Sequence, residues 1–253
     1  MSASPELWPE AYARHVLAEV DSTNSEAARL APRLTQPTWI MARRQTAARG
    51  RRGRAWVSPE GNFAATLVMR PAGDPAAAAL RSFVAALALA DALRDLCGPG
   101  VTIALKWPND VLLNGGKLAG ILLESAGLGQ SNPVLCIGIG VNLIAAPDAA
   151  MVEPGATPPV SLLGETGLRV TPEAFLDALA PAYAQWEATL TEQGFSPLRE
   201  AWLSHAARLG EVIKARTGSL TREGVFETID AAGNLILRMS DGRVAIPAAE
   251  VFF

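Results

Sequence analysis

Hydrophobic and polar residues repeat with two different periods along the chain, and this change of period predicts a mixture of strands and helices. A short strand is predicted over residues 15–20. A helix is predicted to begin near Thr23, because Thr23 and Glu26 have the spacing of a capping box. Residues 38–46 and 61–71 alternate as strands do. These two predicted strands therefore frame an arginine-rich segment.

The middle of the chain carries its most apolar segments. Asp74 and Pro75 suit the N-cap and first turn of a long core helix that continues to about Cys97. Residues 102–125 form two strand-like runs, and Asn114 and Gly115 at the bend favour a primed hairpin turn. Residues 133–143 have little polar character, which predicts a central strand. Residues 171–190 have the pattern of an amphipathic helix.

The pattern changes again from about Leu209, where short alternating strands are separated by turn pairs such as Asp241-Gly242. This change predicts a small β-barrel of about 45 residues. We therefore expect an α+β protein with two domains, residues 1–206 and residues 207–253.

Composition and charge exclude several classes of protein. The 253 residues have a formal net charge of −3 and no separate acidic and basic halves, so the whole-chain charge gives no reason to expect nucleic acid or an anionic membrane as partner. The N-terminal residues have no secretory pattern, and the most apolar stretch, residues 83–90, is shorter than a bilayer span. Cys97 and Cys136 do not have the spacing of a metal site. We expect a cytoplasmic protein with both cysteines reduced in the core.

The segment from Arg43 to Arg54 holds six arginines, interleaved with Gly50 and Gly53. Glycine lets the backbone approach a ligand, and guanidinium groups offer forked donors to phosphate or carboxylate oxygens. Composition alone allows three interpretations: a phosphate-binding loop, a nucleic-acid contact and a solvated loop. The position of the segment, between two apolar strands of a slightly acidic chain, favours a phosphate-binding loop at an active site.

A second candidate segment contains Lys106 and Asp110, and Lys117 follows across the predicted hairpin. The chain has only three lysines against 22 lysines and arginines together, which hints that Lys106 or Lys117 is needed as a compact charge. Asp110 and Lys117 lie on facing strands and could meet. The alternative is a surface ion pair of little energetic value. Residues 138–142 lack the third glycine of a dinucleotide fingerprint and instead suit a strand with bulges or close backbone approach.

Together these residues resemble the biotin protein ligase family. The resemblance is specific from residue 22 to residue 143, and its motifs occur in the family's order. They are Ser22-Thr23-Asn24, Gln45-Thr46-Ala47, the run from Arg49 to Arg54 with Trp56, Ser58-Pro59, Gly61-Asn62, Lys106 to Asp110, Lys117 to Leu122 and Gly138 to Asn142. One departure is Ala48, where the family usually has glycine. If that position needs a positive φ, the alanine would cost about 1 kcal/mol.

The resemblance implies a catalytic domain like that of class II aminoacyl-tRNA synthetases, followed by an SH3-like barrel. It also implies roles for individual residues. In the family's pattern the biotin-binding residues correspond to Ser22, Thr23, Asn24, Gln45, Arg49, Gly50, Arg51 and Lys117. The ATP-binding residues correspond to Arg51, Arg52, Trp56 and Asn142, and the catalytic residues to Lys117, Arg49, Arg51 and Asp110. The residues that would hold a metal are not defined.

The implied activity is that of a biotin ligase, which converts biotin and ATP with Mg²⁺ to biotinyl-5′-AMP and passes biotin to a lysine of a biotin carboxyl carrier protein. A homodimer is possible, whereas a membrane is not expected as partner. Few residues precede Ser22, so we expect the short monofunctional form without a DNA-binding domain. Two alternatives are a lipoate or octanoate ligase or transferase, and, from another class, an RNA-binding module that uses the Arg/Gly loop.

Overall fold

A seven-stranded sheet with the order β1-β2-β3-β7-β6-β5-β4 forms the centre of the first domain. The computed structural model describes residues 8–126, 133–148, 152–153 and 155–253. The strands are β1 (Ala13–Val20), β2 (Thr38–Gln45), β3 (Phe63–Met69), β4 (Ile103–Lys106), β5 (Asp110–Leu113), β6 (Gly116–Ala126) and β7 (Val134–Val141). Strand β7 is the middle strand, as its apolar sequence predicted. All pairs are antiparallel except β1 with β2.

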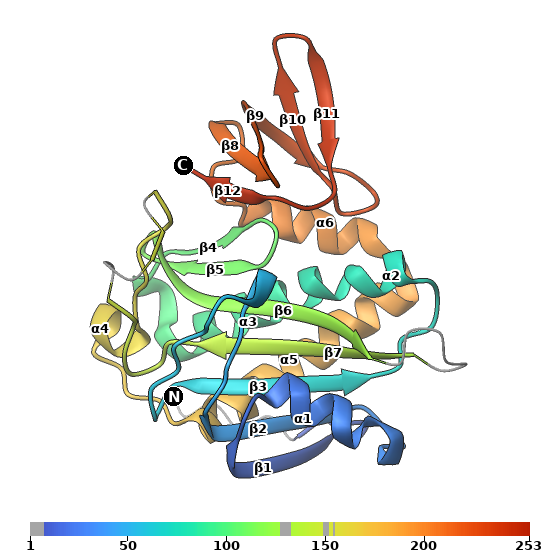
Figure 1. Cartoon of the computed structure of the whole chain (residues 1–253), viewed down its shortest axis with the longest axis vertical. Coiled ribbons are helices and arrows are strands. Elements are labelled where there is room, and N and C mark those ends of the chain that lie inside the picture. The colour runs from blue at the N-terminus through green and yellow to red at the C-terminus, as the bar shows by residue number, and fades with distance from the viewer. Residues whose placement is uncertain (1–7, 127–132, 149–151, 154) are drawn as a thin grey trace.

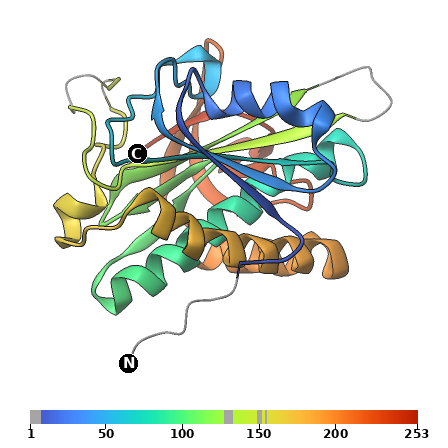
Figure 2. The ribbon, with the colours of Figure 1, turned by 90° about the horizontal axis from the view of Figure 1, so that it is seen from below.

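Helices cover both faces of this sheet (Figure 2). Helix α1 (Thr23–Leu30) lies on one face, which we call the outer face, and α3 (Arg81–Cys97) and α5 (Pro172–Gln193) lie on the other. The side chains of β3 alternate between these faces: Phe63, Ala65 and Leu67 join the core under α3 and α5. Val68 instead packs with Ala27 of α1. Three shorter helices complete the described domain, α2 (Pro75–Ala79), α4 (Leu162–Thr166) and α6 (Phe195–Ser204).

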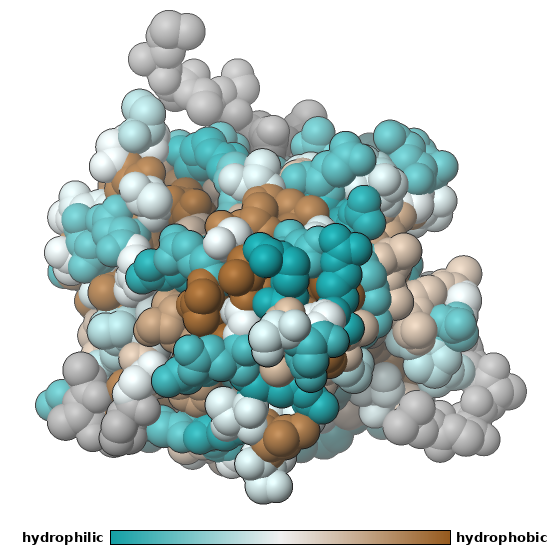
Figure 3. All heavy atoms as spheres, turned by 90° about the horizontal axis from the view of Figure 1, so that it is seen from above, coloured by the Kyte–Doolittle hydropathy of each residue, from teal (hydrophilic) through white to brown (hydrophobic). Residues whose placement is uncertain are grey.

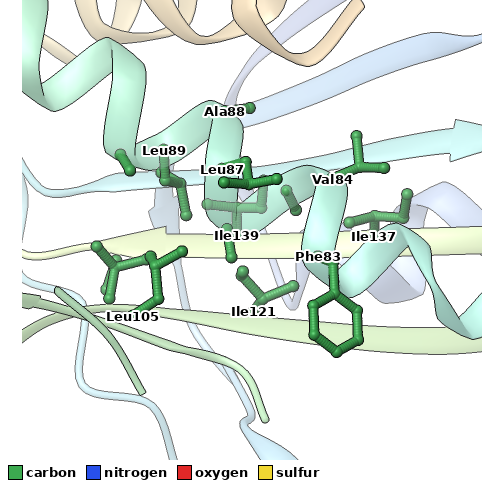
Figure 4. Close-up of a cluster of buried hydrophobic side chains, with 14 of the residues drawn as sticks. Phe83, Val84, Leu87, Ala88, Leu89, Leu105, Ile121, Ile137 and Ile139 are labelled. Atoms are coloured by element: carbon green, nitrogen blue, oxygen red, sulfur yellow. The ribbon is translucent and has the colours of Figure 1, made fainter. Parts of the chain in front are cut away.

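One part of the core lies where α3 packs on β6 and β7. Figure 4 shows Phe83, Val84 and Leu87 of the helix pointing toward Ile121, Ile137 and Ile139 of the sheet. By length and composition alone, the helical stretch 75–100 could cross a membrane. The apolar segment is therefore longer than residues 83–90, which were identified from the sequence. In the fold, most of its apolar window is buried. We therefore interpret it as a core helix.

The second domain is a five-stranded antiparallel sheet with the order β11-β10-β9-β8-β12. Its strands are β8 (Val212–Thr217), β9 (Leu220–Ile229), β10 (Leu235–Met239), β11 (Gly242–Ile246) and β12 (Glu250–Phe252). It stands at the end of the first domain nearest β4, β5 and α6 (Figure 1). Figure 3 looks onto this end of the molecule, where hydrophilic residues alternate with small hydrophobic groups. The predicted boundary at residues 206–207 falls in the segment that joins α6 to β8.

Several local predictions hold and several are wrong. Asp74 caps α2 by accepting from the Ala77 amide at 2.8 Å, but the predicted long helix breaks at Leu80. Helix α1 begins at Thr23, as predicted, yet the capping box does not form, because the N-cap is Ser22 and its side chain makes no capping hydrogen bond. The run before Asn114 is two strands, β4 and β5, separated by a cis Trp107–Pro108 bond. Helix α6 was not predicted from the sequence pattern.

Candidate active site

One cavity of about 770 Å³ opens on the outer face of the sheet, beyond the N-terminus of α1. Its walls come from segments that are far apart in the sequence. They are the start of α1, residues 49–57, the β4–β5–β6 hairpins, β7, residues near 156–159 and the strand β12 of the second domain. The second domain therefore supplies part of the wall of a cavity that lies mainly in the first.

The floor of the cavity is made of glycines. Gly120 of β6 pairs with Gly140 of β7, and a Cβ atom added at Gly140 would lie 2.7 Å from the indole of Trp56. A Cβ atom added at Gly138 would lie 2.3 Å from Asn24 Oδ1. The glycines thus admit one side chain at each end of the cavity. This is the close backbone approach that the sequence predicted for residues 138–142.

One end of the cavity is neutral and polar. Ser22, Thr23 and Asn24 are each less than 5% exposed, and they line the cavity together with Gln45. The Thr23 amide donates to Gln45 Oε1 at 2.8 Å, which ties α1 to the end of β2. Buried polar groups of this kind favour a neutral ligand that can satisfy them.

The centre of the cavity holds a lysine and an aspartate. Lys117 Nζ lies 2.7 Å from Asp110 Oδ1, and the two side chains are 30% and 15% exposed. The predicted cross-strand contact therefore exists, but inside the cavity and not on a solvated surface. Lys106, only 7% exposed, also lines the cavity. Burial lowers the pKa of Lys106, while the Asp110 charge opposes this shift.

The arginine loop, residues 48–54, carries left-handed backbone at Arg52 and Gly53 and not at Ala48. Ala48 is therefore not strained, which removes the expected penalty. Arg49 lines the cavity and pairs with Glu124 at 3.0 Å. Arg51 donates to Asn109 Oδ1 at 3.2 Å and to the Ala249 carbonyl at 3.3 Å. Burial lowers the pKa of Arg51.

Arg51 differs from its neighbours because no ion pair involves it among the described residues. Arg52 and Arg54 instead pair with Glu250 of β12, at 3.0 and 2.7 Å. Arg51 is thus a partly buried cation at the cavity wall that makes no direct ion pair among the described residues, although Asp110 and Glu250 act on its charge from further away. Such a group suits an anionic ligand.

At the far end of the floor, Asn142 is 2% exposed, and its Nδ2 donates to the Val160 carbonyl at 3.1 Å. This bond orients the amide, and Oδ1 is a buried acceptor without a hydrogen-bond partner among the described residues. Trp56 lies on the neighbouring glycines, with its ring 5.8 Å from Lys117 Nζ. Trp56 and Asn142 therefore offer a flat aromatic surface beside an acceptor that has no partner among the described residues.

The fold brings together nearly all of the residues predicted from the sequence. The cavity lining includes Ser22, Thr23, Asn24, Gln45, Arg49, Gly50, Arg51, Trp56, Asp110, Lys117 and Asn142. Arg52 is not among the lining residues and faces Glu250. The prediction missed Glu250 and the glycine floor. Gly138 and Gly140 carried a sequence signal, whereas Glu250 has none because it lies in the other domain.

Among the described residues, no group of three or more His, Cys, Asp or Glu side chains could hold a metal ion. Cys136 is buried and Cys97 is partly buried, and both are free. Burial raises the pKa of the Cys136 thiol to about 11. The cavity therefore offers cations and neutral polar groups and contains no cysteine in its lining.

Comparison with known proteins adds to this geometry. Residues 16–142 match the model of the Biotin/lipoate A/B protein ligase family, and residues 209–253 match that of the Biotin protein ligase C terminal domain. A Biotin--[acetyl-CoA-carboxylase] ligase from Paracoccus denitrificans is 63% identical over 238 residues, which are 94% of this chain and 99% of that protein.

Two more distant proteins show the same likeness. The Bifunctional ligase/repressor BirA of Escherichia coli is 29% identical over 93% of this chain and 74% of its own length. The solved structure of the biotin protein ligase from Aquifex aeolicus in complex with biotin and ATP superimposes with a TM-score of 0.79 at 25% identity, over 94% of this chain and 97% of that one. The predicted fold class is thereby confirmed.

Proposed function

Because the chain belongs to the biotin protein ligase family, we propose that its cavity joins biotin to ATP as biotinyl-5′-AMP and then transfers biotin to a lysine of a biotin carboxyl carrier protein. The relative from Paracoccus denitrificans is named for acetyl-CoA carboxylase, so the acceptor is the carrier protein of that enzyme. The family likeness covers the catalytic residues and the C-terminal domain alike.

A single observation carries the proposal: one cavity has a neutral polar end and a cationic centre on a continuous glycine floor. Biotin has a neutral ureido ring at one end and a carboxylate at the other. Ser22, Thr23 and Gln45 are suited to the ring. Lys117, Arg49 and Arg51 are suited to the carboxylate and to the α-phosphate of ATP. The cavity therefore matches the order of groups in biotinyl-5′-AMP.

The first step is an in-line attack of a biotin carboxylate oxygen on the α-phosphorus of ATP. The bond from this phosphorus to the bridging oxygen of pyrophosphate breaks, and pyrophosphate leaves with the electron pair. Both reactants are anions, so the residues act by holding them close together and by stabilising the developing charge. Lys117 and Arg51 supply that charge, and Asp110 orients the Lys117 ammonium.

The nucleotide lies at the other end of the floor. Trp56 offers its ring to adenine, and the free Asn142 Oδ1 accepts from the adenine amino group. Arg52 faces Glu250, so its expected contact with ATP requires the loop to turn when the nucleotide binds. The experiment that isolates this end is ATP binding by Asn142→Ala, which should weaken while biotin binding is kept.

Mg²⁺ fits this cavity as the companion of ATP, because Mg²⁺ is commonly held by one or two carboxylates together with substrate phosphates. Asp110 is a carboxylate of the cavity lining and would approach it through Oδ2, because Oδ1 pairs with Lys117. Bound there, Mg²⁺ would neutralise part of the polyphosphate charge.

In the second step the acceptor lysine, in its uncharged form, attacks the carbonyl carbon of the mixed anhydride. An amide bond forms and AMP leaves with the electrons of the broken bond to oxygen. The intermediate must be kept from water until the carrier arrives. The arginine loop and β12 close one side of the cavity, which supports this role.

The two alternatives are less well supported. The family model at residues 16–142 includes lipoate ligases by name, but residues 209–253 match a domain named for biotin protein ligases. An RNA-binding role would need the loop arginines to face outward, whereas Arg49 and Arg51 line the cavity. Two other predictions, a homodimer and a cytoplasmic location, stay predictions.

The test is to incubate the purified protein with biotin, ATP and Mg²⁺ and to look for biotinyl-5′-AMP by mass spectrometry. Reactions with lipoate or octanoate in place of biotin are run in parallel. The proposal predicts an adenylate with biotin and little or none with the other acids. Adenylation of lipoate alone would contradict the proposed substrate, and salt-dependent RNA binding without ATP turnover would favour the RNA-binding alternative.

A further inference from the structure

A chain of hydrogen-bonded side chains lies behind the neutral end of the cavity. Thr66 of β3 and Glu124 of β6 both point to the outer face of the sheet, and neither is among the residues that line the cavity. On β7, Gly138 pairs with Thr66 and Cys136 pairs with Glu124, and the Asn24 amide fills the space that a side chain at Gly138 would occupy. Thr66 is fully buried. Asn24 is therefore enclosed by Thr66 on one side and Glu124 on the other.

The direction of each hydrogen bond follows from the chemistry of Glu124. Asn24 Nδ2 donates to Glu124 Oε2 at 2.6 Å, and an ionised carboxylate can only accept. The amide is thereby oriented with its Oδ1 toward Thr66, whose hydroxyl lies 2.6 Å away and must donate. The single hydroxyl hydrogen of Thr66 is then used.

The hydroxyl hydrogen of Thr23 is also used within the protein. Thr23 Oγ1 lies 2.9 Å from Thr66 Oγ1 and 3.2 Å from Gln45 Oε1. The Thr23 hydroxyl donates to Gln45 Oε1, and Thr66 Oγ1, whose own hydrogen is directed to Asn24, is the other acceptor within reach. Gln45 Oε1 already accepts from the Thr23 amide. Thr23 Oγ1 therefore offers only lone pairs to a ligand, and Gln45 offers the hydrogens of its Nε2.

This polarity is complementary to a ureido ring, which has two N–H donors and one carbonyl acceptor. We propose that Thr66 and Glu124 are positioning residues that set which groups of the neutral end donate and which accept, and so determine its selectivity for a cyclic urea. The inference rests on the proposed function, because it takes biotin as the ligand. Neither residue touches the ligand; both act through Asn24 and Thr23.

Thr66→Val tests the first residue, since valine has a similar shape and no hydroxyl. Without the Thr66 hydroxyl, Asn24 Oδ1 loses its donor and Thr23 Oγ1 loses one of its two neighbours, so neither side chain is held in the orientation that the ligand needs. We expect biotin affinity to fall about 10-fold, with the KM for ATP and the kcat for adenylate formation close to wild type. Thr66→Ser keeps the hydroxyl and should restore most of the affinity.

Thr38→Val is the matched control. Thr38 is also a buried strand threonine, 1% exposed, but its hydroxyl bonds to the Gln36 carbonyl at the opposite end of β2 from Gln45. It should leave biotin affinity unchanged. Calorimetric binding of biotin without ATP, with the thermal midpoint of each variant, separates a local effect from loss of fold.

Glu124→Gln tests the second residue, because a glutamine amide can donate to Asn24 Oδ1. The Asn24 amide can then invert and donate to Thr66, whose hydroxyl turns to donate to Thr23 Oγ1 and occupies a lone pair that the ligand would otherwise use. We expect a loss of biotin affinity of at least about 10-fold. Arg49 also loses its ionic partner, so ATP affinity can change as well. Glu173→Gln removes the exposed pair with Arg43 and serves as the control.

Gln45→Ala distinguishes a failure of the positioning role from a failure of the proposed function. If the wild type makes biotinyl-5′-AMP and Gln45→Ala weakens biotin while Thr66→Val and Glu124→Gln bind it normally, the positioning role is wrong and the proposed function stands. Equal weakening by Thr66→Val and Thr66→Ser would also overturn it, because the hydroxyl would not be responsible. If the wild type forms no adenylate with biotin, the proposed function itself fails.

Discussion

Lys117 has two neighbours that define its environment, the Asp110 carboxylate at 2.7 Å and the ring of Trp56 at 5.8 Å. A compact ammonium between them can approach both the biotin carboxylate and the α-phosphate. Lys117→Ala should lower the rate of adenylate formation about 10² to 10³-fold, because a fixed charge is lost in the transition state. Lys117→Arg should restore little, since the guanidinium fork is larger.

The control for this prediction is Lys214→Ala on the second domain. Lys214 pairs with Glu223 at 3.6 Å with both side chains more than half exposed, so it should leave the rate unchanged. The measurement is single-turnover formation of biotinyl-5′-AMP. A near-normal rate in Lys117→Ala would make Lys117 only an ion-pair partner of Asp110.

Lys106 gives the site a dependence on pH. Burial lowers its pKa from 10.5, and the charge of Lys117 adds to the effect while Asp110 opposes it. Lys106 is a cation below its lowered pKa and loses its charge as the pH rises through that value. The KM for ATP should therefore rise at alkaline pH. Lys106→Met should raise this KM about 10-fold at pH 7 and remove the alkaline dependence.

The measurement is the KM for ATP in adenylate formation between pH 7 and 10, where the acceptor lysine plays no part. Lys214→Met is a suitable control, because this exposed lysine lies in the second domain. If Lys106→Met shows the same alkaline rise as the wild type, another group is responsible for it.

Single residues were predictable from sequence where their partner is near in the chain. Asp110 and Lys117 are joined by a short hairpin, so their contact followed from strand pairing. The loop arginines were identified, but their partners Glu124 and Glu250 were not. Those contacts depend on how distant segments pack against each other, and the sequence pattern does not predict this packing. At Ala48 the sequence suggested a strain that the structure does not have. The family usually has glycine at this position, but the backbone of Ala48 does not have a positive φ.

At the scale of elements, strand β7 determines how far two other elements can enter the cavity. Gly138 admits Asn24 from α1, and Gly140 admits Trp56 from the segment after the arginine loop. Gly138→Ala should weaken biotin more than ATP, and Gly140→Ala should weaken ATP more than biotin. Each loss should be about 10-fold, which corresponds to the usual cost of overpacking.

The measurement is the affinity of each variant for both ligands by calorimetry. The two variants control for each other, because the substitutions are the same and the positions lie two residues apart on one strand. A similar loss of both ligands in both variants would mean that β7 is distorted as a whole and that the floor has no separate ends.

Long elements were predictable from their apolar pattern: α5 buries one face, whereas β3 and β7 are buried on both faces and have little polar character. The residues at which helices and strands begin and end were less predictable. The capping box at Thr23 and Glu26 fails because both side chains have stronger partners: Thr23 contacts Gln45 and Thr66, and Glu26 pairs with Arg29. The break at Leu80 and the division of β4 from β5 likewise follow from tertiary packing.

At the scale of the whole molecule, an ionic network joins the second domain to the arginine loop. Glu250 of β12 contacts Arg52 and Arg54 of the loop, and Arg216 of β8. Arg216 also contacts Glu153, at 2.7 Å. Burial alone would raise the pKa of Glu250, but the hydrogen bonds from Arg216 and the charges of Arg54 and Arg52 together hold it below its usual value. Glu250 is thus ionised and placed to hold the loop against the second domain.

Glu250→Gln should weaken this connection without changing the shape of the side chain. The loop would open more often, because its arginines repel one another and, among the described residues, an uncharged contact that ties it to the second domain is the bond from Arg51 to the Ala249 carbonyl, next to β12. We expect biotinyl-5′-AMP to dissociate about 10-fold faster, since hydrogen bonds to charged groups are each worth about 1.5–3 kcal/mol when removed. Formation of the adenylate should change less, because the residues at the reacting centre stay in place.

The experiment measures the off-rate of biotinyl-5′-AMP together with tryptic cleavage in residues 49–54, with and without the ligand. Glu223→Gln is the matched control: it removes a carboxylate from the same sheet, and its only described ion pair is with exposed Lys214. Faster cleavage of Glu250→Gln in the free protein, with partial protection by the ligand, would show that β12 restrains a loop whose closed state the ligand also favours. An unchanged off-rate and an unchanged cleavage pattern would mean that the loop is held by its own hydrogen bonds, such as that of the Gly50 amide to the Arg54 carbonyl at 2.7 Å, and that the second domain contributes only a wall to the cavity.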